Sequence, residues 1–245
     1  MKTALTIAGS DPSGGAGVQA DVLTFRALGV RGLSAVTAIT VQNRLEVREM
    51  QVVPPRLLAA QVEALLDEFT VDAVKIGMLG SAANARAVAG LIDGGGLPKV
   101  VLDPVMVSSS GFELLGRGGV GAIRGLVART ALITPNIPEA AALAGIEITG
   151  VEGMEEAARA ILAMGAGAVL VTGGHIEGPP VDVLYDGGEF TRLRSRRVGG
   201  GRERLHGTGC LLSAGAAAGL ARGLAVAGAV SEAKRYVEET LRKRR

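Results

Sequence analysis

The residues best suited to chemistry lie in one short run, His-Gly-Thr-Gly-Cys at positions 206–210, before a small-residue helix expected from Leu211 to Leu224. The two glycines allow backbone N–H groups to point into one concavity at the start of that helix, where the helix dipole also favours an anion. Cys210 falls in the first turn, where positive potential is expected to lower the pKa of its thiol. A thiolate there could take a proton from a substrate hydroxyl while the amides hold a migrating phosphoryl group. The competing interpretation is a loop that only closes a helix, with Cys210 as a small buried apolar residue.

A second glycine-rich segment, residues 9–17, opens a helix expected over Val18 to Leu28. A dinucleotide site is disfavoured because the G-x-G-x-x-G spacing is absent, with Ala20 in the third place, and no ribose-binding acid ends the second strand. The segment fits better as a flexible loop over a small ligand, with Asp21 able to accept a hydrogen bond from a hydroxyl group. Spacing alone also allows Asp21 to be a plain charge on the helix surface.

The segment Pro-Asn-Ile-Pro-Glu at 135–139 follows an expected strand and starts a helix. Asn136 could cap that helix, with Glu139 completing a capping-box-like pair. The Glu139 carboxylate could instead lie near Mg²⁺ or its waters beside nucleotide phosphates. Spacing does not choose between these. The two histidines, His175 and His206, do not have the spacing of a zinc site, and no serine lies in a nucleophile elbow.

These motifs need a scaffold, and the chain alternates short apolar runs with helical stretches. The alternation predicts an α/β fold with a mostly parallel sheet and helices on both faces. In such sheets ligands bind beyond the carboxyl ends of the strands, where the polar loops collect. The segments 40–53 and 181–197 break the alternation and predict hairpins, the second turning at 186–188. We expect one domain, 1–245. The expected strands are Leu5–Ala8, Ser34–Ile39, Ala73–Ile76, Val100–Leu102, Ala131–Thr134 and Ala168–Thr172.

Composition excludes several classes of protein. Hydrophobic residues make up 48% of the chain, so a core can be buried, but aromatic residues make up only 2%, too few for the stacking platforms of a nucleic-acid binder. The net charge is only +2, and the arginines clustered at 192–204 and 242–245 are typical of solvated segments. A single cysteine, no leader-like start and no apolar stretch of about 18 residues predict a cytoplasmic protein with no membrane partner.

Seven motifs in sequence resemble those of the hydroxymethylpyrimidine/phosphomethylpyrimidine kinases of the ribokinase superfamily. They lie at 8–17, 42–43, 74–79, 101–106, 134–139, 173–175 and 206–210, over almost the whole chain. The resemblance implies a ribokinase-like three-layer α/β/α sandwich with small β-hairpin additions. It implies transfer of the ATP γ-phosphate, with Mg²⁺, to the hydroxymethyl group of 4-amino-5-hydroxymethyl-2-methylpyrimidine and then to its monophosphate, in thiamine biosynthesis. Relatives are commonly homodimers, which makes the segment from Thr40 to Val53 a candidate interface ribbon.

Matching positions assign roles to individual residues. The resemblance implies a catalytic cysteine, where many sugar kinases of the superfamily carry Asp, beside an anion hole. The side-chain chemistry supports two pyrimidine contacts independently, because a Gln amide matches an aminopyrimidine edge and a Met thioether adapts to a flat ring. The implied sites are: catalytic, Cys210, Gly207, Thr208 and Gly209; pyrimidine, Gly9, Ala16, Asp21, Gln42, Met78 and Val105; nucleotide, Asn136, Thr172, Gly174 and His206; Mg²⁺, Asp103 and Glu139.

The chain departs from the family's pattern at three places. Residues 199–205 replace a Thr- or Asn-rich segment, while Ser109 and Thr172 stand where lysines are frequent. These changes bear on the nucleotide side and on the second phosphorylation more than on the first. Two alternatives remain open: a pyridoxal kinase, which Gln42 disfavours because a pyridine lacks the aminopyrimidine edge, and a non-catalytic pyrimidine-binding protein on a degenerate kinase scaffold.

Overall fold

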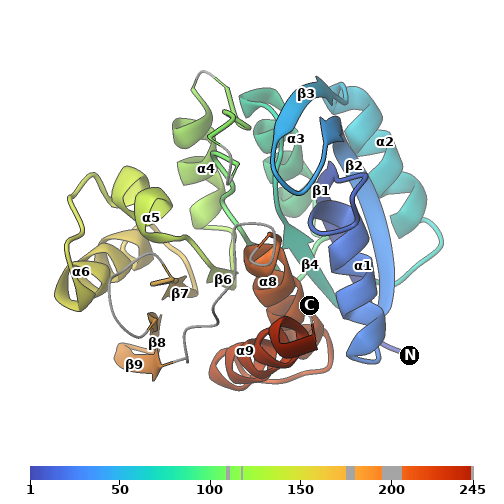
Figure 1. Ribbon diagram of the computed structural model, residues 1–245. Helices are drawn as coiled ribbons and strands as arrows, with labels where there is room; N and C mark the ends of the chain where they lie inside the picture. The colour runs from blue at the N-terminus through green and yellow to red at the C-terminus, as the bar shows by residue number, and fades with distance from the viewer. Residues whose placement is uncertain (109–110, 117, 175–179, 195–205, 244–245) are drawn as a thin grey trace.

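Nine strands of the chain form one sheet in a computed structural model, which describes residues 1–108, 111–116, 118–174, 180–194 and 206–243 (Figure 1). The strand order is β3-β2-β1-β4-β5-β6-β7-β8-β9. The six central strands are parallel, whereas β3, β8 and β9 pair antiparallel at the two edges. The strands are β1 (Thr3–Ser10), β2 (Arg31–Gln42), β3 (Val47–Val52), β4 (Ala73–Ile76), β5 (Val100–Leu102), β6 (Leu132–Ile133), β7 (Ala168–Val171), β8 (Val181–Asp186) and β9 (Glu189–Arg194).

The short apolar runs form the centre of the sheet because both of their faces are covered. Every residue of β4, β5 and β7 is buried, as expected for parallel strands between two helical layers. The predicted bounds of β4 and β5 are confirmed residue for residue. The strand predicted at 131–134 is shorter than expected, and the one predicted at 34–39 is longer because it continues into the β2–β3 hairpin.

Helices cover both faces of the sheet, which confirms the three-layer prediction (Figure 1). One apolar core lies under α2 to α6, and a second lies under α1, α8 and α9. The first layer contains α2 (Pro55–Leu66), α3 (Ala82–Asp93), α4 (Gly119–Val127), α5 (Ile137–Ala144) and α6 (Val151–Leu162). The second contains α1 (Gly17–Ala27), α8 (Thr208–Ala221) and α9 (Val226–Lys243).

The small residues of α8 have a packing reason. A Cβ on Gly215 would lie 2.9 Å from the Cβ of Ala233, and one on Gly219 would lie 2.7 Å from the Cβ of Ala229. Glycine therefore lets α9 approach α8 more closely than a larger residue would allow. The helix begins three residues earlier than predicted, so Cys210 is its third residue.

Two hairpins complete the sheet edges. In the β2–β3 turn, Asn43 Oδ1 accepts hydrogen bonds from the backbone N–H groups of Leu45 (2.8 Å) and Glu46 (3.0 Å). The β8–β9 turn contains Gly187 and Gly188, both at positive φ (58° and 88°), as the sequence predicted. All the described strands belong to one sheet, and one domain stays a prediction. In the part of the chain that the structure describes, no helix combines the length and the apolar character needed to cross a bilayer.

Candidate functional site

The two glycine-rich segments singled out in the sequence lie against each other. Gly207 has φ +77° and directly precedes α8, and a Cβ added there would overlap the carbonyl oxygen of Gly15. A Cβ added to Gly15 would in turn lie 2.6 Å from Cδ2 of His206. Both contacts require glycine, because a side chain would force the loops apart. The start of α8 and the loop before α1 therefore pack directly against each other.

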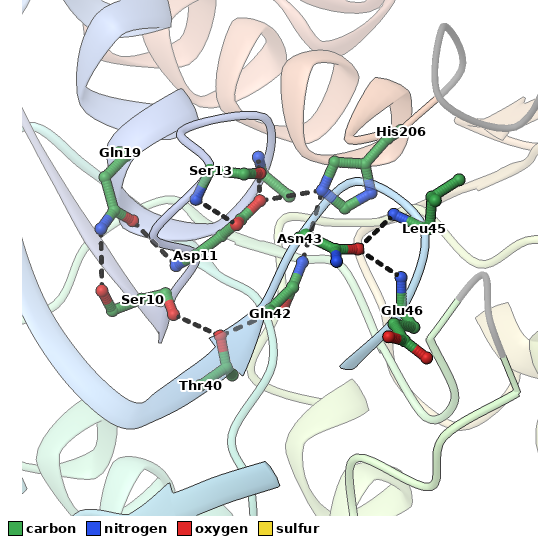
Figure 2. A network of polar contacts seen from close by, with 11 residues as sticks. Ser10, Asp11, Ser13, Gln19, Thr40, Gln42, Asn43, Leu45, Glu46 and His206 are labelled. Atoms are coloured by element: carbon green, nitrogen blue, oxygen red, sulfur yellow. Dashed lines mark hydrogen bonds and ion pairs between the residues drawn. The ribbon is translucent and has the colours of Figure 1, made fainter. Parts of the chain in front are cut away.

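Asp11 links these two segments (Figure 2). Its Oδ1 accepts from the backbone N–H of Ser13 (2.8 Å), and its Oδ2 accepts from the backbone N–H of Ala16 (2.9 Å) and lies 2.8 Å from His206 Nε2. Burial alone would raise the pKa of Asp11, but the hydrogen bonds from His206 and Ser13 outweigh it and lower that pKa. Asp11 is therefore a charged acceptor that fixes both the loop and the His206 ring.

His206 lies closer to the expected pyrimidine residues than its predicted nucleotide role suggests. Besides Asp11, its Nε2 is 3.4 Å from Nε2 of Gln42 (Figure 2). The Gln42 amide also contacts the Thr40 hydroxyl (Oγ1–Oε1 3.2 Å), and that hydroxyl donates to the Ser10 carbonyl oxygen at 2.8 Å. Gln42 at the end of β2 is thus held between β1 and the start of α8. A nucleotide contact by His206 stays a prediction.

Met78 lies directly over Gly9, because a Cβ on Gly9 would overlap the Met78 methyl group. Thr37 Oγ1 donates to the Met78 carbonyl oxygen (2.6 Å) and fixes the backbone there. Val105 follows β5, and its N–H donates to the Asp103 carbonyl oxygen (2.8 Å). The structure therefore joins Gly9 to Met78, as the resemblance implies.

Asp103 faces the first turn of α8. The Ser213 hydroxyl donates to its Oδ2 (3.0 Å), and a Cβ on Gly209 would lie 3.8 Å from the same oxygen. Burial raises the pKa of Asp103, while the Lys75 charge and the Ser213 hydrogen bond lower it. Ser213 is a residue that the sequence did not single out, since a serine inside a small-residue helix gives no signal of a buried acid partner.

Glu139 and Asn136 form the predicted capping box at the start of α5. Asn136 N–H donates to Glu139 Oε2 (2.9 Å), and Glu139 N–H donates to Asn136 Oδ1 (3.0 Å). Burial and the charge of Asp103 raise the pKa of Glu139 to about 8. The capping interpretation is confirmed. The second interpretation stays open, because the two carboxyl groups are close enough to repel each other.

The expectation for the Cys210 thiol is wrong in the free protein. Burial raises its pKa to about 11; the Lys75 charge opposes this, while Asp21 and Asp103 add to it. A hydrogen bond from the Gly17 backbone lowers the pKa, but not enough to offset removal from water. The thiol is therefore protonated at neutral pH.

Asp21 is not a charge on the helix surface, because its side chain has no exposed area. Its Oδ2 accepts from Thr6 Oγ1 (2.6 Å) and from Lys75 Nζ (2.8 Å). Burial lowers the pKa of Lys75, but the nearby Asp21, Cys210 and Asp103 raise it by more, so the net shift is upward. A hydrogen bond from substrate to Asp21 stays a prediction. Lys75 was missed, although a lysine inside a strand expected to be buried on both faces requires a buried acid.

Of the four residues expected on the nucleotide side, Asn136, Thr172 and Gly174 lie at or just beyond the ends of β6 and β7, whereas His206 lies at the start of α8. Asn136 and Thr172 form a parallel bridge, and Thr172 N–H donates to the Pro135 carbonyl oxygen (2.9 Å). A Cβ on Gly174 would meet nothing within 4 Å. The departures at Ser109 and 199–205, and His175, lie outside the described residues.

The chain matches the family model described as phosphomethylpyrimidine kinase over residues 11–245. It is 44% identical over 241 residues to the hydroxymethylpyrimidine/phosphomethylpyrimidine kinase of Rhizobium meliloti, a match that covers 97% of this chain and 90% of the relative. It is 43% identical over 240 residues to the thiamine biosynthesis bifunctional protein ThiED of Geobacter sulfurreducens. That match covers 97% of this chain and about half (49%) of the longer relative.

Solved structures give the same picture. The phosphomethylpyrimidine kinase of Clostridium difficile superimposes with a TM-score of 0.87 at 36% identity, covering 98% of this chain and all (100%) of the other. The pyridoxal kinase of Staphylococcus aureus in complex with pyridoxal gives a TM-score of 0.90 at 32% identity, covering 99% and 88%. With its ribokinase-like fold and its match to the family model over residues 11–245, this chain belongs to the phosphomethylpyrimidine kinase family.

Proposed function

We propose that this protein uses ATP to phosphorylate 4-amino-5-hydroxymethyl-2-methylpyrimidine and then its monophosphate, in thiamine biosynthesis. One observation carries the proposal: His206 and Gly207 pack directly against the loop at 9–17. The start of α8, which is expected to bind an anion, therefore lies beside the residues expected to hold the heterocycle. The names of relatives, in which this activity recurs, support the same assignment.

The pyrimidine end is built for a flat ring. Met78 supplies an apolar, polarizable surface over the Gly9 backbone, and any residue larger than glycine at position 9 would displace it. Gln42 supplies a donor and an acceptor side by side, which suits a ring nitrogen next to an exocyclic amine. The Thr40 and His206 contacts hold that amide in place before substrate arrives.

The phosphate end relies on backbone amides. Among the residues that the structure describes, no side chain caps the start of α8, whose N-cap residue is Gly207. Amides at 207–209 would hold the transferred phosphoryl group, with the helix dipole behind them. Because Cys210 is protonated in the free protein, with a pKa of about 11, its sulfur can take the hydroxyl proton only after the thiol has given up its own proton to water. Since phosphoryl transfer depends mainly on positioning and charge stabilisation, this proton transfer is needed only late, as the hydroxyl oxygen bonds to phosphorus.

Asp103 and Glu139 fit a role beside Mg²⁺. Each is nearly buried, and the charge of Asp103 raises the pKa of Glu139, so a cation between them would relieve their repulsion. Within the described residues no group of three or more His, Cys, Asp or Glu side chains is arranged to cage a metal. This donor set suits Mg²⁺, which commonly binds through one or two carboxylates, waters and substrate phosphates. When bound, the ion would neutralise phosphate charge.

Pyridoxal kinase is the second candidate, favoured by the close fold of the Staphylococcus aureus enzyme. Both candidate substrates carry a hydroxymethyl group on an aromatic heterocycle. Comparing kcat/KM for the two with purified protein and ATP tests the choice. We expect preference for the aminopyrimidine, and a preference for pyridoxal would overturn the proposal.

Catalysis itself is tested by ATP consumption and by Cys210→Ala. We expect pyrimidine-dependent ATP turnover in the wild type and a sharp loss of kcat in the variant with its unfolding transition retained. A protein that binds the pyrimidine without consuming ATP would be a binding protein on a kinase scaffold. A normal kcat in Cys210→Ala would remove the thiol from the mechanism.

The second phosphorylation is tested by supplying the monophosphate as the only acceptor. Thr172 replaces a lysine frequent in the family, so we expect a higher KM for the monophosphate than for the alcohol. Failure to convert the monophosphate at any concentration would restrict the proposal to the first step.

We further propose that the protein is a cytoplasmic homodimer. Ile39 and Val41 of β2 point outward with 60% and 54% of their surface exposed, while Thr40 between them is buried. Leu45 at the hairpin tip is 60% exposed as well. Together they make an apolar ribbon suited to a second copy of the chain. Light scattering of wild type and Ile39→Glu/Val41→Glu tests this; a monomeric wild type would refute it.

A further inference from the structure

The polar contacts around Gln42 favour one arrangement of hydrogens. Asp11 accepts two backbone N–H bonds and carries a lowered pKa, so its carboxylate is charged and has no hydrogen to give. The 2.8 Å contact between Asp11 and His206 therefore requires a hydrogen on His206 Nε2. This holds whether the imidazole is neutral or cationic, because only the tautomer with a bare Nε2 is excluded.

A hydrogen on His206 Nε2 cannot face the NH₂ group of Gln42. The Nε2 hydrogen is already directed at Asp11, so Nε2 offers no lone pair to the Gln42 NH₂ group drawn 3.4 Å away, and the amide oxygen matches that position better. Thr40 leads to the same result independently. Its single hydroxyl hydrogen goes to the Ser10 carbonyl oxygen at 2.8 Å, so the Gln42 atom 3.2 Å from that hydroxyl must be a donor.

Both contacts are satisfied when the amide makes a half-turn about its last side-chain bond, which exchanges the oxygen and nitrogen drawn in Figure 2. We propose that the Asp11–His206 pair acts as a positioning device that locks the Gln42 amide with its oxygen toward α8 and its NH₂ toward Thr40. His206 and Asp11 then determine specificity through Gln42.

The locked amide would set the direction of the heterocycle. This step rests on the proposed function. In the aminopyrimidine the exocyclic amine lies between the ring nitrogen and the carbon that bears the hydroxymethyl group. An amide with its oxygen near His206 binds the amine at that end, and so turns the hydroxymethyl group toward α8 and Cys210. The opposite amide orientation would turn the hydroxymethyl group away from the anion-binding helix start.

The ligand-free protein provides the first test. Long-range ¹H–¹⁵N NMR spectra report which imidazole nitrogen carries hydrogen, and the chain has only two histidines, so His175→Gln assigns the signals. We expect His206 Nε2 to be protonated and this signal to change in Asp11→Ala. An unprotonated Nε2 would overturn the inference, whatever the substrate of the enzyme.

The second test uses the 4-oxo analogue of the pyrimidine, in which the donor and acceptor of the edge are exchanged. We expect wild type to prefer the amino compound strongly in kcat/KM. His206→Leu frees the amide to turn, so the preference should fall about tenfold, the factor that one net hydrogen bond commonly contributes. His206→Gln, which restores an N–H donor, should recover most of it, and the control Leu57→Ala, at a residue of α2 that is 55% exposed, should keep it.

The outcomes separate the two ideas. A wild type that phosphorylates neither pyrimidine defeats the proposed function, and the NMR result then decides the Asp11–His206 inference alone. A wild type that prefers the amino compound, with the same preference in His206→Leu, defeats the inference and leaves the proposed function standing. Loss of preference in both His206→Leu and Leu57→Ala would also refute a specific role for His206.

Discussion

Lys75 Nζ lies 2.8 Å from Asp21 Oδ2 in an ion pair with no exposed surface on either side chain. Thr6 donates to the same oxygen, while Asp21 Oδ1 is buried and has no hydrogen-bond partner within the described chain. The pair joins β4 to α1 and lies where its charges act on Cys210 and Asp103. A buried pair of this kind stabilises a fold only while both partners are present.

The first prediction therefore concerns Lys75→Met. The substitution leaves the Asp21 carboxylate buried and unpaired, which commonly costs about 3–5 kcal/mol of unfolding free energy. Urea denaturation should show a loss of this order. The double variant Lys75→Met/Asp21→Leu should be more stable than Lys75→Met, because it removes both charges. If the loss in the double variant equals the sum of the losses in Lys75→Met and Asp21→Leu, the two residues do not interact as described.

The second prediction compares Gly207, where a close contact requires glycine, with Gly90, where no contact does. Gly207→Ala should lower both the unfolding temperature and kcat, because φ is +77° and the new Cβ would overlap the Gly15 carbonyl oxygen at the anion-binding turn. Gly90→Ala is the matched control, inside α3 with nothing within 4 Å of the new Cβ. It should gain about 0.5–1 kcal/mol and keep kcat. Equal effects of the two substitutions would argue against the close approach of the loops.

The sequence predicts elements well where the pattern is local. The bounds of β4 and β5 follow from short apolar runs, and the Asn136–Glu139 capping box follows from spacing. It fails where the effect depends on residues far apart in the chain. The pKa of Cys210 reflects burial and charges from Lys75 and Asp103, which no local pattern near position 210 contains.

The Asp11–His206 contact was missed for the same reason, since 195 positions separate the two residues. Asp11 and His206 both occur in motifs that the sequence singled out, but their pairing depends on how β1 and α8 are brought together. The spacing of Asp21 allowed a contact with a ligand hydroxyl or a plain charge on the helix surface, and it did not predict burial. The lysine in the middle of β4 was the available clue, because its charge needed a buried partner.

The third prediction concerns substrate binding at Gly9. Gly9→Ala places a Cβ against the methyl end of Met78, a flexible group that can move aside, so stability should change by less than about 1 kcal/mol. The displaced side chain should enter the space expected for the ring and raise KM for the pyrimidine with little change in kcat. Steady-state kinetics and thermal unfolding test this split.

Gly9→Ala/Met78→Ala is the control for that interpretation, because it removes the overlapping methyl group. KM in the double variant should lie below that of Gly9→Ala. A KM that stays at the wild-type value in Gly9→Ala would place the ring elsewhere.

The fourth prediction follows from the direction of the Cys210 pKa shift. Burial raises this pKa from 9.0 to about 11 in the folded protein, so above pH 9 the unfolded chain loses the thiol proton before the folded protein does. The stabilising contribution is fully present below pH 9 and is lost as the pH rises toward 11. Wild type should therefore lose unfolding free energy relative to Cys210→Ser between pH 8 and pH 10.5, by roughly 1–2 kcal/mol.

Paired urea titrations of wild type and Cys210→Ser measure this difference directly. Tyrosines and lysines also titrate in that range, but they are common to both proteins and cancel in the comparison. Serine keeps the size of the side chain nearly unchanged and does not ionise there. If the difference in unfolding free energy between wild type and Cys210→Ser is constant with pH, folding leaves the thiol pKa at its ordinary value. The Cys210 thiol could then lose its proton more easily, and the thiolate could act early in phosphoryl transfer. If the unfolding free energy of wild type falls steadily relative to that of Cys210→Ser above pH 9, the thiol pKa is raised in the folded protein, which supports late proton transfer. The backbone amides at the start of α8 would then carry most of the stabilisation of the transferred phosphoryl group.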